Sequence, residues 1–400
     1  MVLAMGWPSR SAPERSTEVL FATGPRIDAS RKRPNEGIYE FLDRSAKPLF
    51  GEVRRVLNEW LAGLPEEAPR ELVPRLRSND QAFESAFWEL YLYTAYIRSG
   101  YRVTVHPQIA GSTNHPDFMV DGNGTRFYLE AVRVGTAAAD VAAERRLQDL
   151  KAALARQHHD RFELSMLYWE IGPAPLPTNA LLHRIDSWLS SLDPDALFEA
   201  LSHGSIFDNA PRFPWRRDGW RLEFQAIPLA ADAIGDSQSL VVMSGPGEAQ
   251  VVDNPTGVLR VLDSKANRYG SMGHPLVIAV MSNTEYPTED YEFEKALFGL
   301  AVGRRVDSIR DPSLVRIDGH WLTRHGWRRG HTPQVIAASC LKPWLITQVH
   351  PRLWTTLEPD VAAPSQPDWL SGVHIGEDGT SVELGSSLET LFGLPPGWGG

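Results

Sequence analysis

The feature that most constrains the fold of this chain is a glutamate inside an apolar run. Residues Arg126–Val132 read as a buried strand, and Glu130 stands in the middle of it. A buried carboxylate is costly unless it is paired or binds a cation. The run follows a second apolar stretch, Phe118–Val120, across the turn sequence Asp121–Gly124. We therefore expect a β-hairpin in which Glu130 has a charged partner.

A second acidic residue, Asp117, stands at the start of the first hairpin strand, directly after a proline. The hairpin can bring the carboxylates of Asp117 and Glu130 side by side, where they repel each other. A divalent cation is the simplest relief, and oxygen ligands favour Mg²⁺ or Mn²⁺ over zinc. Glu89 lies on a helix predicted over 80–100 and is a third candidate ligand, with Glu84 on the same helix as its alternative.

The order of the predicted elements indicates an α/β protein. The helix over 80–100 is followed by strands at 101–106, 118–120 and 126–132, a helix over 137–157 and a strand at 162–171. Such an order is typical of a mixed sheet covered by helices. Farther along, a helix over 257–269 leads into an apolar strand at 275–282. We expect three regions, namely an N-terminal helical extension over 1–79, a core over 80–303, and a C-terminal β-containing region over 304–400 with a Pro/Gly-rich tail.

The runs Pro116-Asp117 and Glu130-Ala131-Val132, after a helix that bears Glu89, resemble the motif of the PD-(D/E)XK nuclease superfamily, which has the restriction-endonuclease-like fold. The resemblance covers roughly Asp80–Ile171. It implies a mixed sheet flanked by helices and a metal-dependent nuclease that hydrolyses phosphodiester bonds in DNA, or in RNA, in host defence or restriction. It also implies that Asp117 and Glu130 hold Mg²⁺ or Mn²⁺ and that Glu89 holds it directly or through water.

The chain departs from this motif at one position. The lysine that the superfamily carries two residues after the second acid is Val132 here. In the superfamily that lysine orients the attacking water and stabilises charge in the transition state. The chain has only six lysines, and Lys151 and Lys265 are the two that could replace it. We favour Lys265 as the catalytic lysine because its helix leads into the strand at 275–282.

Each acid also has a structural interpretation. Glu130 can be a strand residue paired with Arg126 or Arg133, which flank it. Asp117 can initiate a turn, because Asp and Pro both favour turns. Glu89, taken alone, reads as a solvated or salt-bridged helix residue. The joint order and spacing of the three acids favour a common site.

Two stretches rich in Arg and Trp bear on nucleic-acid binding, because arginine binds phosphate bidentately and aromatic rings stack on unpaired bases. The stretch over 304–331 supplies the four residues that we expect to contact nucleic acid: Arg324, Trp327, Arg328 and Arg329. Loops packed on the core are the equal alternative there, and packing is the favoured interpretation of Arg212–Arg221. The expected partner is nucleic acid, with DNA favoured, and a homodimer is compatible with the sequence.

Composition excludes several classes of protein. Hydrophobic residues make up 42% of the 400 residues, so wholesale disorder is excluded. The single cysteine, Cys340, excludes an intramolecular disulfide framework and a Cys-rich zinc site. The net charge of −10 argues against coating nucleic acid by bulk charge but is compatible with a local basic patch. No apolar run approaches the roughly 20 residues of a membrane span, and no signal peptide is recognisable, so we expect a cytoplasmic protein without a membrane partner.

The sequence thus predicts a Mg²⁺-dependent endonuclease that uses Asp117, Glu130, Glu89 and Lys265. The alternative is a catalytically inactive nucleic-acid-binding or assembly module on the same fold. Val132, at the position of the motif lysine, is the strongest argument for that alternative.

Overall fold

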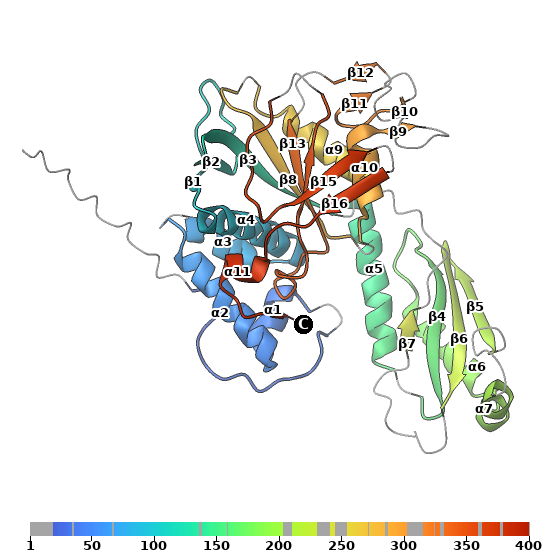
Figure 1. The fold of residues 1–400 in the computed structure, drawn as a ribbon. Helices are drawn as coiled ribbons and strands as arrows, with labels where there is room; N and C mark the ends of the chain where they lie inside the picture. Colours follow the sequence, from blue (N-terminus) through green and yellow to red (C-terminus); the bar gives the residue numbers. More distant parts are fainter. Residues whose placement is uncertain are drawn as a thin grey trace, which may run out of the picture. The chain divides into compact units, whose positions relative to one another are not determined.

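The chain divides into two units, each with its own sheet (Figure 1). A computed structural model describes residues 19–33, 36–65, 68–135, 138–157, 159–202, 210–229, 241–244, 254–270, 272–284, 287–301, 315–323, 325–328, 332–358, 362–376 and 379–399. Unit 1 comprises residues 1–31, 37–135 and 253–400, and unit 2 comprises residues 32–36 and 136–252. Most of unit 2 is therefore inserted between two segments of unit 1.

Unit 1 is built around a mixed sheet with eight strands among the described residues. In spatial order these strands are β1 (Arg102–Val105), β2 (Phe118–Gly122), β3 (Thr125–Val134), β8 (Leu276–Ser282), β13 (Gln334–Ser339), β14 (Arg352–Thr355), β15 (Ser371–Gly376) and β16 (Gly379–Glu383). The first three form an antiparallel meander, whereas β3, β8 and β13 run parallel to one another. All residues of β8 are buried, as expected for a parallel strand that is covered on both faces.

The hairpin predicted from the turn sequence is formed by β2 and β3. Its turn residues Asn123-Gly124 both have positive φ (49° and 75°), which suits the tight turn that matches strand twist. The register pairs Phe118 with Leu129. Asp117 directly precedes β2, so the end of the paired region brings it beside Glu130 of β3.

Apolar side chains alternate between the two faces of this sheet. On β8, the side chains of Val277, Ala279 and Met281 join one core and those of Ile278 and Val280 join the other. The first core also contains residues of α1 (Ile38–Arg44), α2 (Pro48–Ala62), α3 (Ala68–Leu76), α4 (Asp80–Arg98) and α11 (Leu388–Phe392). The second contains residues of α9 (Asn254–Ala266) and α10 (Asp290–Phe298). Helices therefore cover both faces of the sheet (Figure 1).

Helix α4 is fixed to the centre of the sheet by a buried hydrogen bond. The side chain of Asn79 caps the helix, because its Oδ1 accepts the N–H of Ala82 at 3.0 Å. Farther along, the indole N–H of Trp88 donates to the carbonyl oxygen of Ala279 on β8 at 2.9 Å. Since Trp88 is fully buried, this bond helps to set which α4 side chains approach β1, β2 and β3.

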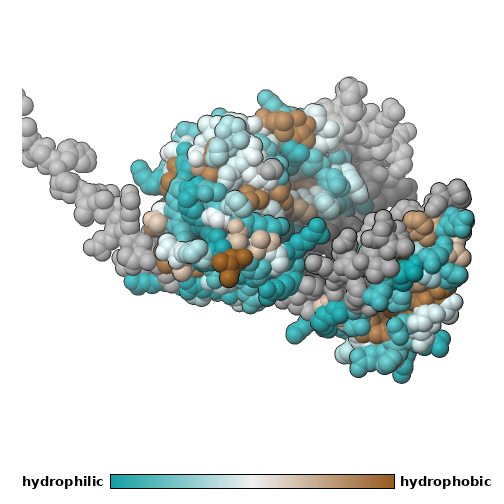
Figure 2. All heavy atoms as spheres, turned by 90° about the horizontal axis from the view of Figure 1, so that it is seen from below, coloured by the Kyte–Doolittle hydropathy of each residue, from teal (hydrophilic) through white to brown (hydrophobic). Residues whose placement is uncertain are grey.

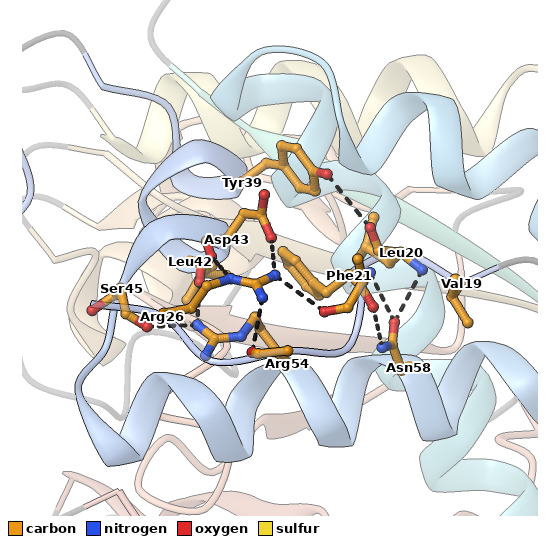
Figure 3. A network of polar contacts seen from close by, with 12 residues as sticks. Val19, Leu20, Phe21, Arg26, Tyr39, Leu42, Asp43, Ser45, Arg54 and Asn58 are labelled. Atoms are coloured by element: carbon orange, nitrogen blue, oxygen red, sulfur yellow. Dashed lines mark hydrogen bonds and ion pairs between the residues drawn. The ribbon is translucent and has the colours of Figure 1, made fainter. Parts of the chain in front are cut away.

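The first described segment is tied to α1 and α2 by hydrogen bonds between side chains and backbone (Figure 3). Asn58 of α2 accepts the N–H groups of Leu20 and Phe21 at 3.0 and 3.1 Å, and it donates to the carbonyl oxygen of Phe21 at 2.9 Å. Arg26 donates to the backbone carbonyl of Asp43 at 2.5 Å and to its carboxylate at 2.7 Å. The segment and the helices that follow it thus share the first core of unit 1.

Unit 2 contains a separate sheet and a separate hydrophobic core. Among its described residues the strand order is β5 (Arg212–Arg217), β6 (Trp220–Pro228), β4 (Phe162–Glu170) and β7 (Val241–Ser244). Its helices are α5 (Ala138–Ala155), α6 (Thr178–Leu189) and α7 (Pro194–Ser202). The turn Asp218-Gly219 joins β5 to β6 with positive φ at both residues (50° and 82°), so this hairpin is also closed tightly.

Two short pairs of strands complete the described structure of unit 1. β9 (Leu300–Ala301) pairs with β10 (Val315–Ile317), and β11 (Leu322–Thr323) pairs with β12 (Gly326–Trp327). Among the described residues, no helix combines the length and the apolar content needed to cross a bilayer. On the face shown in Figure 2, hydrophobic patches are small and are separated by hydrophilic residues.

The predicted fold class is confirmed at the level of a mixed α/β protein with a large mixed sheet flanked by helices. The helix predicted over 137–157 and the strand predicted at 162–171 are present as α5 and β4, but both belong to unit 2. The expectation that this strand extends the sheet of the hairpin is therefore wrong, because β8 occupies the position beside β3. Unit 1 contains residues from all three predicted regions, 1–79, 80–303 and 304–400.

We expect the hydrogen bond from Trp88 to contribute measurably to stability. Trp88→Phe removes the donor to Ala279, and a hydrogen bond of this kind contributes about 1 kcal/mol net. Trp354 is the matched control, because it is 1% exposed and its indole N–H has no hydrogen-bond partner among the described residues. Urea unfolding should show a loss about 1 kcal/mol larger for Trp88→Phe than for Trp354→Phe. Equal losses would contradict the assigned bond.

Candidate functional site

The carboxylate of Glu130 accepts hydrogen bonds from side chains of α9 and of the segment that follows this helix. Glu130 lies in β3 and is 2% exposed. Its Oε1 accepts a hydrogen bond from Lys265 Nζ at 2.5 Å, and its Oε2 accepts one from the hydroxyl of Tyr269. The guanidinium of Arg268 lies 3.8 Å from Oε1. Both oxygens of the buried carboxylate are therefore satisfied, which offsets much of the cost of burying it.

These three partners come from one short segment at the C-terminal end of α9. Lys265 lies in the last turn of the helix, and Arg268 and Tyr269 follow in the turn beyond it. α9 ends at Ala266, and the chain then bends so that the backbone N–H of Arg268 donates to the carbonyl oxygen of Lys265 at 3.2 Å. Burial and the carboxylate of Glu130 raise the pKa of Tyr269. Its hydroxyl therefore stays protonated and acts as a donor to Glu130.

Asp117 lies just before β2, where the pairing between β2 and β3 stops. Its Oδ2 accepts the backbone N–H of Ala131 at 2.7 Å, so the side chain takes the place of a ladder partner. The N–H of His106 donates to its carbonyl oxygen at 2.9 Å. Burial, followed by the carboxylates of Glu130 and Glu89, raises the pKa of Asp117 well above its ordinary value, and the bond from Ala131 opposes the rise. The carboxyl group of Asp117 therefore lies close to two other carboxylates and holds its proton more tightly than an exposed aspartic acid does.

Glu89 interacts electrostatically with Asp117 but already has a partner. Its two carboxylate oxygens accept hydrogen bonds from the guanidinium of Arg75 at 2.7 and 2.6 Å. That pairing raises the pKa of Arg75. A small cavity of about 20 Å³ is lined by Glu89, His106 and Phe118 among others. The salt-bridged interpretation of Glu89 is confirmed, and a role as metal ligand would require Arg75 to move.

Glu84, the alternative to Glu89, belongs to a different ion cluster. It is 5% exposed, and its carboxylate accepts hydrogen bonds from Arg133 Nε and Lys342 Nζ, both at 2.5 Å. Arg133 lies on β3 and points toward α4, on the face opposite to Glu130, as the two-residue period of a strand predicts. Glu84 therefore has its own counter-charges.

The structural interpretation of Glu130 named the wrong partners. Arg126 pairs with Asp121, its neighbour across the hairpin, and Arg133 pairs with Glu84. Arg133 points to the opposite face of β3, and Arg126 shares the face of Glu130 but stands four residues away along the strand and is paired with Asp121. The partner comes from a helix that is distant in the sequence.

The two candidate lysines lie in different units. Lys265 contacts Glu130 directly, whereas Lys151 lies on α5 of unit 2, with its ammonium 5.4 Å from the ring centre of Trp169. Val132, at the position of the motif lysine, is half-buried on β3. It shares the face of Glu130, because the two are separated by one residue. The structure thus brings Lys265 to the acid that the motif lysine would accompany.

Sequence reasoning did not select Arg268, Tyr269 or Arg75 as site residues. A signal existed for the first two, since they stand three and four residues after Lys265. On the helix predicted over 257–269, residues three and four positions after Lys265 would lie on the same side as Lys265 and could reach the same site. No comparable signal existed for Arg75, because its contact with Glu89 depends on how α3 packs against α4.

The four residues expected to bind nucleic acid are described only in part. Arg324 and Arg329 lie outside the described residues. Trp327 on β12 is half-buried against the second core. Arg328 forms an ion pair with Asp263 of α9, with 2.6 Å between its terminal nitrogen and Oδ2. These contacts favour packing on the core for Trp327 and Arg328.

Asp263 also fixes α9 through a buried histidine. His320 is 1% exposed, and its Nδ1 lies 2.8 Å from Asp263 Oδ1 while its Nε2 lies 3.2 Å from Thr332 Oγ1. Burial alone would raise the pKa of Asp263, but hydrogen bonds from His320 and Arg328 outweigh burial and lower it. The charged Asp263 thus holds the helix that carries Lys265.

Asp117 and Glu130 fit a divalent cation by the chemistry of their donors. Both are carboxylates, and burial together with neighbouring negative charge raises the pKa of Asp117. Oxygen donors in such a place favour Mg²⁺ or Mn²⁺. Among the residues that the structure describes, no three or more His, Cys, Asp or Glu side chains are arranged to hold a metal ion. The fit therefore rests on this pair, with Glu89 engaged by Arg75.

Comparisons with known protein families, with curated proteins and with solved structures found no match to this chain. Function is therefore inferred from the geometry around Glu130, Lys265 and Asp117.

Asp117→Asn should stabilise the protein at neutral pH in the absence of divalent metal. The raised pKa means that the folded state holds the Asp117 proton more tightly than the unfolded state, whose pKa is about 3.9. As pH rises above that value, the unfolded state releases the proton first, so stability falls until pH passes the raised folded pKa. The asparagine side chain does not ionise, so the variant avoids this loss of stability, and its amide oxygen can still accept the N–H of Ala131.

Thermal melts in EDTA test this expectation. At pH 7 the melting temperature of Asp117→Asn should exceed that of the parent by roughly 2 °C or more, and the difference should shrink as pH approaches about 4. Asp121→Asn is the matched control, because Arg126 lowers the pKa of that exposed acid on the same hairpin, and it should give no gain. A destabilised Asp117→Asn at pH 7 would show that the charge of Asp117 supports the fold.

Proposed function

We propose that this chain is a divergent member of the PD-(D/E)XK superfamily that hydrolyses phosphodiester bonds in nucleic acid with Mg²⁺ or Mn²⁺. The observation that carries the proposal is the contact of 2.5 Å between Lys265 Nζ and Glu130 Oε1. A lysine reaches the second acid of the motif although the motif position itself holds Val132. DNA is the favoured substrate, and host defence or restriction is the role that the resemblance suggests.

The order and pairing of the elements around this contact support the proposal. In the chain, α4 is followed by β1, β2 and β3, and α9 later leads into β8, which pairs parallel to β3. This is the order of helix, three strands, helix and strand that the sequence predicts, with β8 in place of the strand at 162–171. Unit 2 separates β3 from α9 in the sequence.

The residues divide the proposed chemistry among them. Asp117 and Glu130 would hold the cation, which when bound lowers the pKa of a water molecule and offsets charge on the phosphate. The attacking water would lose a proton to solvent as its oxygen bonds to phosphorus, and the bond from phosphorus to the leaving oxygen would break as that oxygen takes a proton from solvent. The ammonium of Lys265 can position the water or stabilise the charge that develops on the phosphate oxygens. Tyr269 holds the second oxygen of Glu130 and thereby fixes the orientation of the carboxylate.

A non-catalytic nucleic-acid-binding or assembly module is the second candidate. Two observations favour it. Lys265 and Tyr269 satisfy the carboxylate of Glu130 without a metal ion, and Arg75 occupies both oxygens of Glu89. The candidates differ in whether divalent metal binds at the two acids and whether nucleic acid is cleaved.

A cleavage assay with Mg²⁺ or Mn²⁺ tests the function directly. The parent protein should convert supercoiled plasmid to nicked and linear forms or should degrade labelled single strands of DNA or RNA. Lys265→Ala should lower the rate about a hundredfold to a thousandfold, which is typical of losing one donor to the transition state. Lys151→Ala, in unit 2, is the control and should cleave like the parent.

Moving the lysine back to the motif position sharpens this test. Because Val132 shares the face of Glu130, Val132→Lys combined with Lys265→Ala should restore part of the lost activity, by roughly tenfold or more. Lys265→Met keeps most of the side-chain volume and should be as slow as Lys265→Ala. Equal cleavage by the parent and Lys265→Ala would exclude the assigned role, and a parent that cleaves none of the substrates would exclude the nuclease.

Divalent metal should stabilise the parent protein through Asp117 and Glu130. A ligand that binds only the folded state adds about 2.7 kcal/mol to stability at a hundred times its Kd. Saturating Mg²⁺ or Mn²⁺ should therefore raise the melting temperature of the parent and of Lys265→Ala. Asp117→Asn should lose the shift, whereas Asp121→Asn should keep it. A parent without any shift would favour the non-catalytic module.

A further inference from the structure

A groove in unit 2 combines exposed arginines with two half-buried aromatic side chains, those of Phe213 and Trp215. It has a volume of about 550 Å³ and lies between α6 and the edge strand β5. Six of the residues that line it carry the argument: His183, Arg184, Phe213, Trp215, Arg216 and Arg217. The groove is therefore formed by one helix and one strand of the same compact unit.

The charge of this groove has one sign. Arg184, Arg216 and Arg217 are exposed, and among the described residues that line the groove none is acidic. Arg217 lies 3.3 Å from the carboxylate of the exposed Asp218. The chain as a whole is acidic, with a net charge of −10. A local basic surface on such a chain is suited to binding a polyanion at that one place. Guanidinium groups bind phosphate with two parallel hydrogen bonds.

The aromatic part of the groove is held rigidly. Phe213 stacks on Trp188 of α6, with ring centres 5.2 Å apart, and Trp215 follows on the same face of β5 and is half-buried. Trp220 of the same hairpin has a different role, because it is 1% exposed and donates to the carbonyl oxygen of Ala174. The packing expected for Arg212–Arg221 holds for Trp220, and also for Trp215, which packs against the core of unit 2 with one part of its surface and lines the groove with another.

The β5–β6 hairpin orders the rim of the groove. Its tight turn at Asp218-Gly219 directly follows Arg216 and Arg217. A turn with two positive φ values fixes the register of the flanking strands. Arg217 therefore shares the face of Phe213 and Trp215, whereas Arg216 points to the other face of this edge strand and lines the rim of the groove. Pro214 on this edge strand blocks pairing with a further strand, which leaves the edge open to another kind of ligand.

We propose that the groove between α6 and β5 binds single-stranded nucleic acid, with phosphates on the arginines and a base stacked on Trp215. A single strand is the partner that offers both an anionic backbone and free base faces, whereas the bases of a duplex are stacked on one another. This inference rests on the groove of unit 2 alone and does not require the proposed function.

Fluorescence anisotropy of the full chain with labelled oligo(dT) and oligo(U) in EDTA tests binding without cleavage. Trp215→Leu should weaken binding about tenfold or more, and Trp215→Phe should retain most of it, because an aromatic face contributes to stacking. Arg216→Ala and Arg217→Ala should each weaken binding and lower the slope of log K against log salt by about 0.7. Arg221→Ala is the matched control, because this exposed arginine of β6 pairs with Glu170 and does not line the groove.

Unchanged binding by the groove variants, or no binding by the parent, would overturn the inference, as would equally tight binding of a duplex of the same length. Circular dichroism melts of each variant exclude unfolding as the cause of a loss. If the groove variants lose binding and the parent never cleaves, the results support binding by the groove and exclude the nuclease. If the parent cleaves and the groove variants bind and cleave as well as the parent, the results support the nuclease and exclude binding by the groove.

Discussion

The need to neutralise one buried carboxylate organises unit 1. Glu130 is almost completely enclosed in β3, and its partners Lys265 and Tyr269 come from the segment after unit 2. A buried charge that loses its partner is strongly destabilising. The β2–β3 hairpin can therefore be buried only when β8 has paired with β3 and α9 has brought Lys265 to Glu130. Local strand formation and long-range assembly are coupled through this one side chain.

Charge on both faces of β3 gives that strand a defined register. Glu130 meets Lys265 on one face, and Arg133 meets Glu84 on the other. A slip of one residue would exchange the faces and direct each charge into an apolar core. Two ion pairs on opposite faces therefore exclude the alternative pairing more effectively than apolar residues alone, which fit either face. The same pairs fix α4 and α9 relative to the sheet.

Local signals were sufficient for the hairpin and for the helix that carries Glu89. The turn residues and the alternation of apolar side chains predict β2 and β3, and the register then follows for Asp117 and Glu130. The scarcity of lysine made Lys265 a candidate. Long-range partners were not accessible in this way. The strand at 162–171 carries polar residues, whereas β8 is a continuous apolar run, but which strand lies beside β3 is decided by tertiary packing.

The connection between β3 and β8 has a consequence for how such a chain diversifies. Parallel strands cannot be joined by a tight turn, so a long crossover is required in any case. The entropic cost of closing a loop rises only with the logarithm of its length. A whole folded unit can therefore occupy the crossover at little cost to the sheet. Evolution can alter or exchange unit 2, and with it the groove between α6 and β5, while the strands around Glu130 remain unchanged.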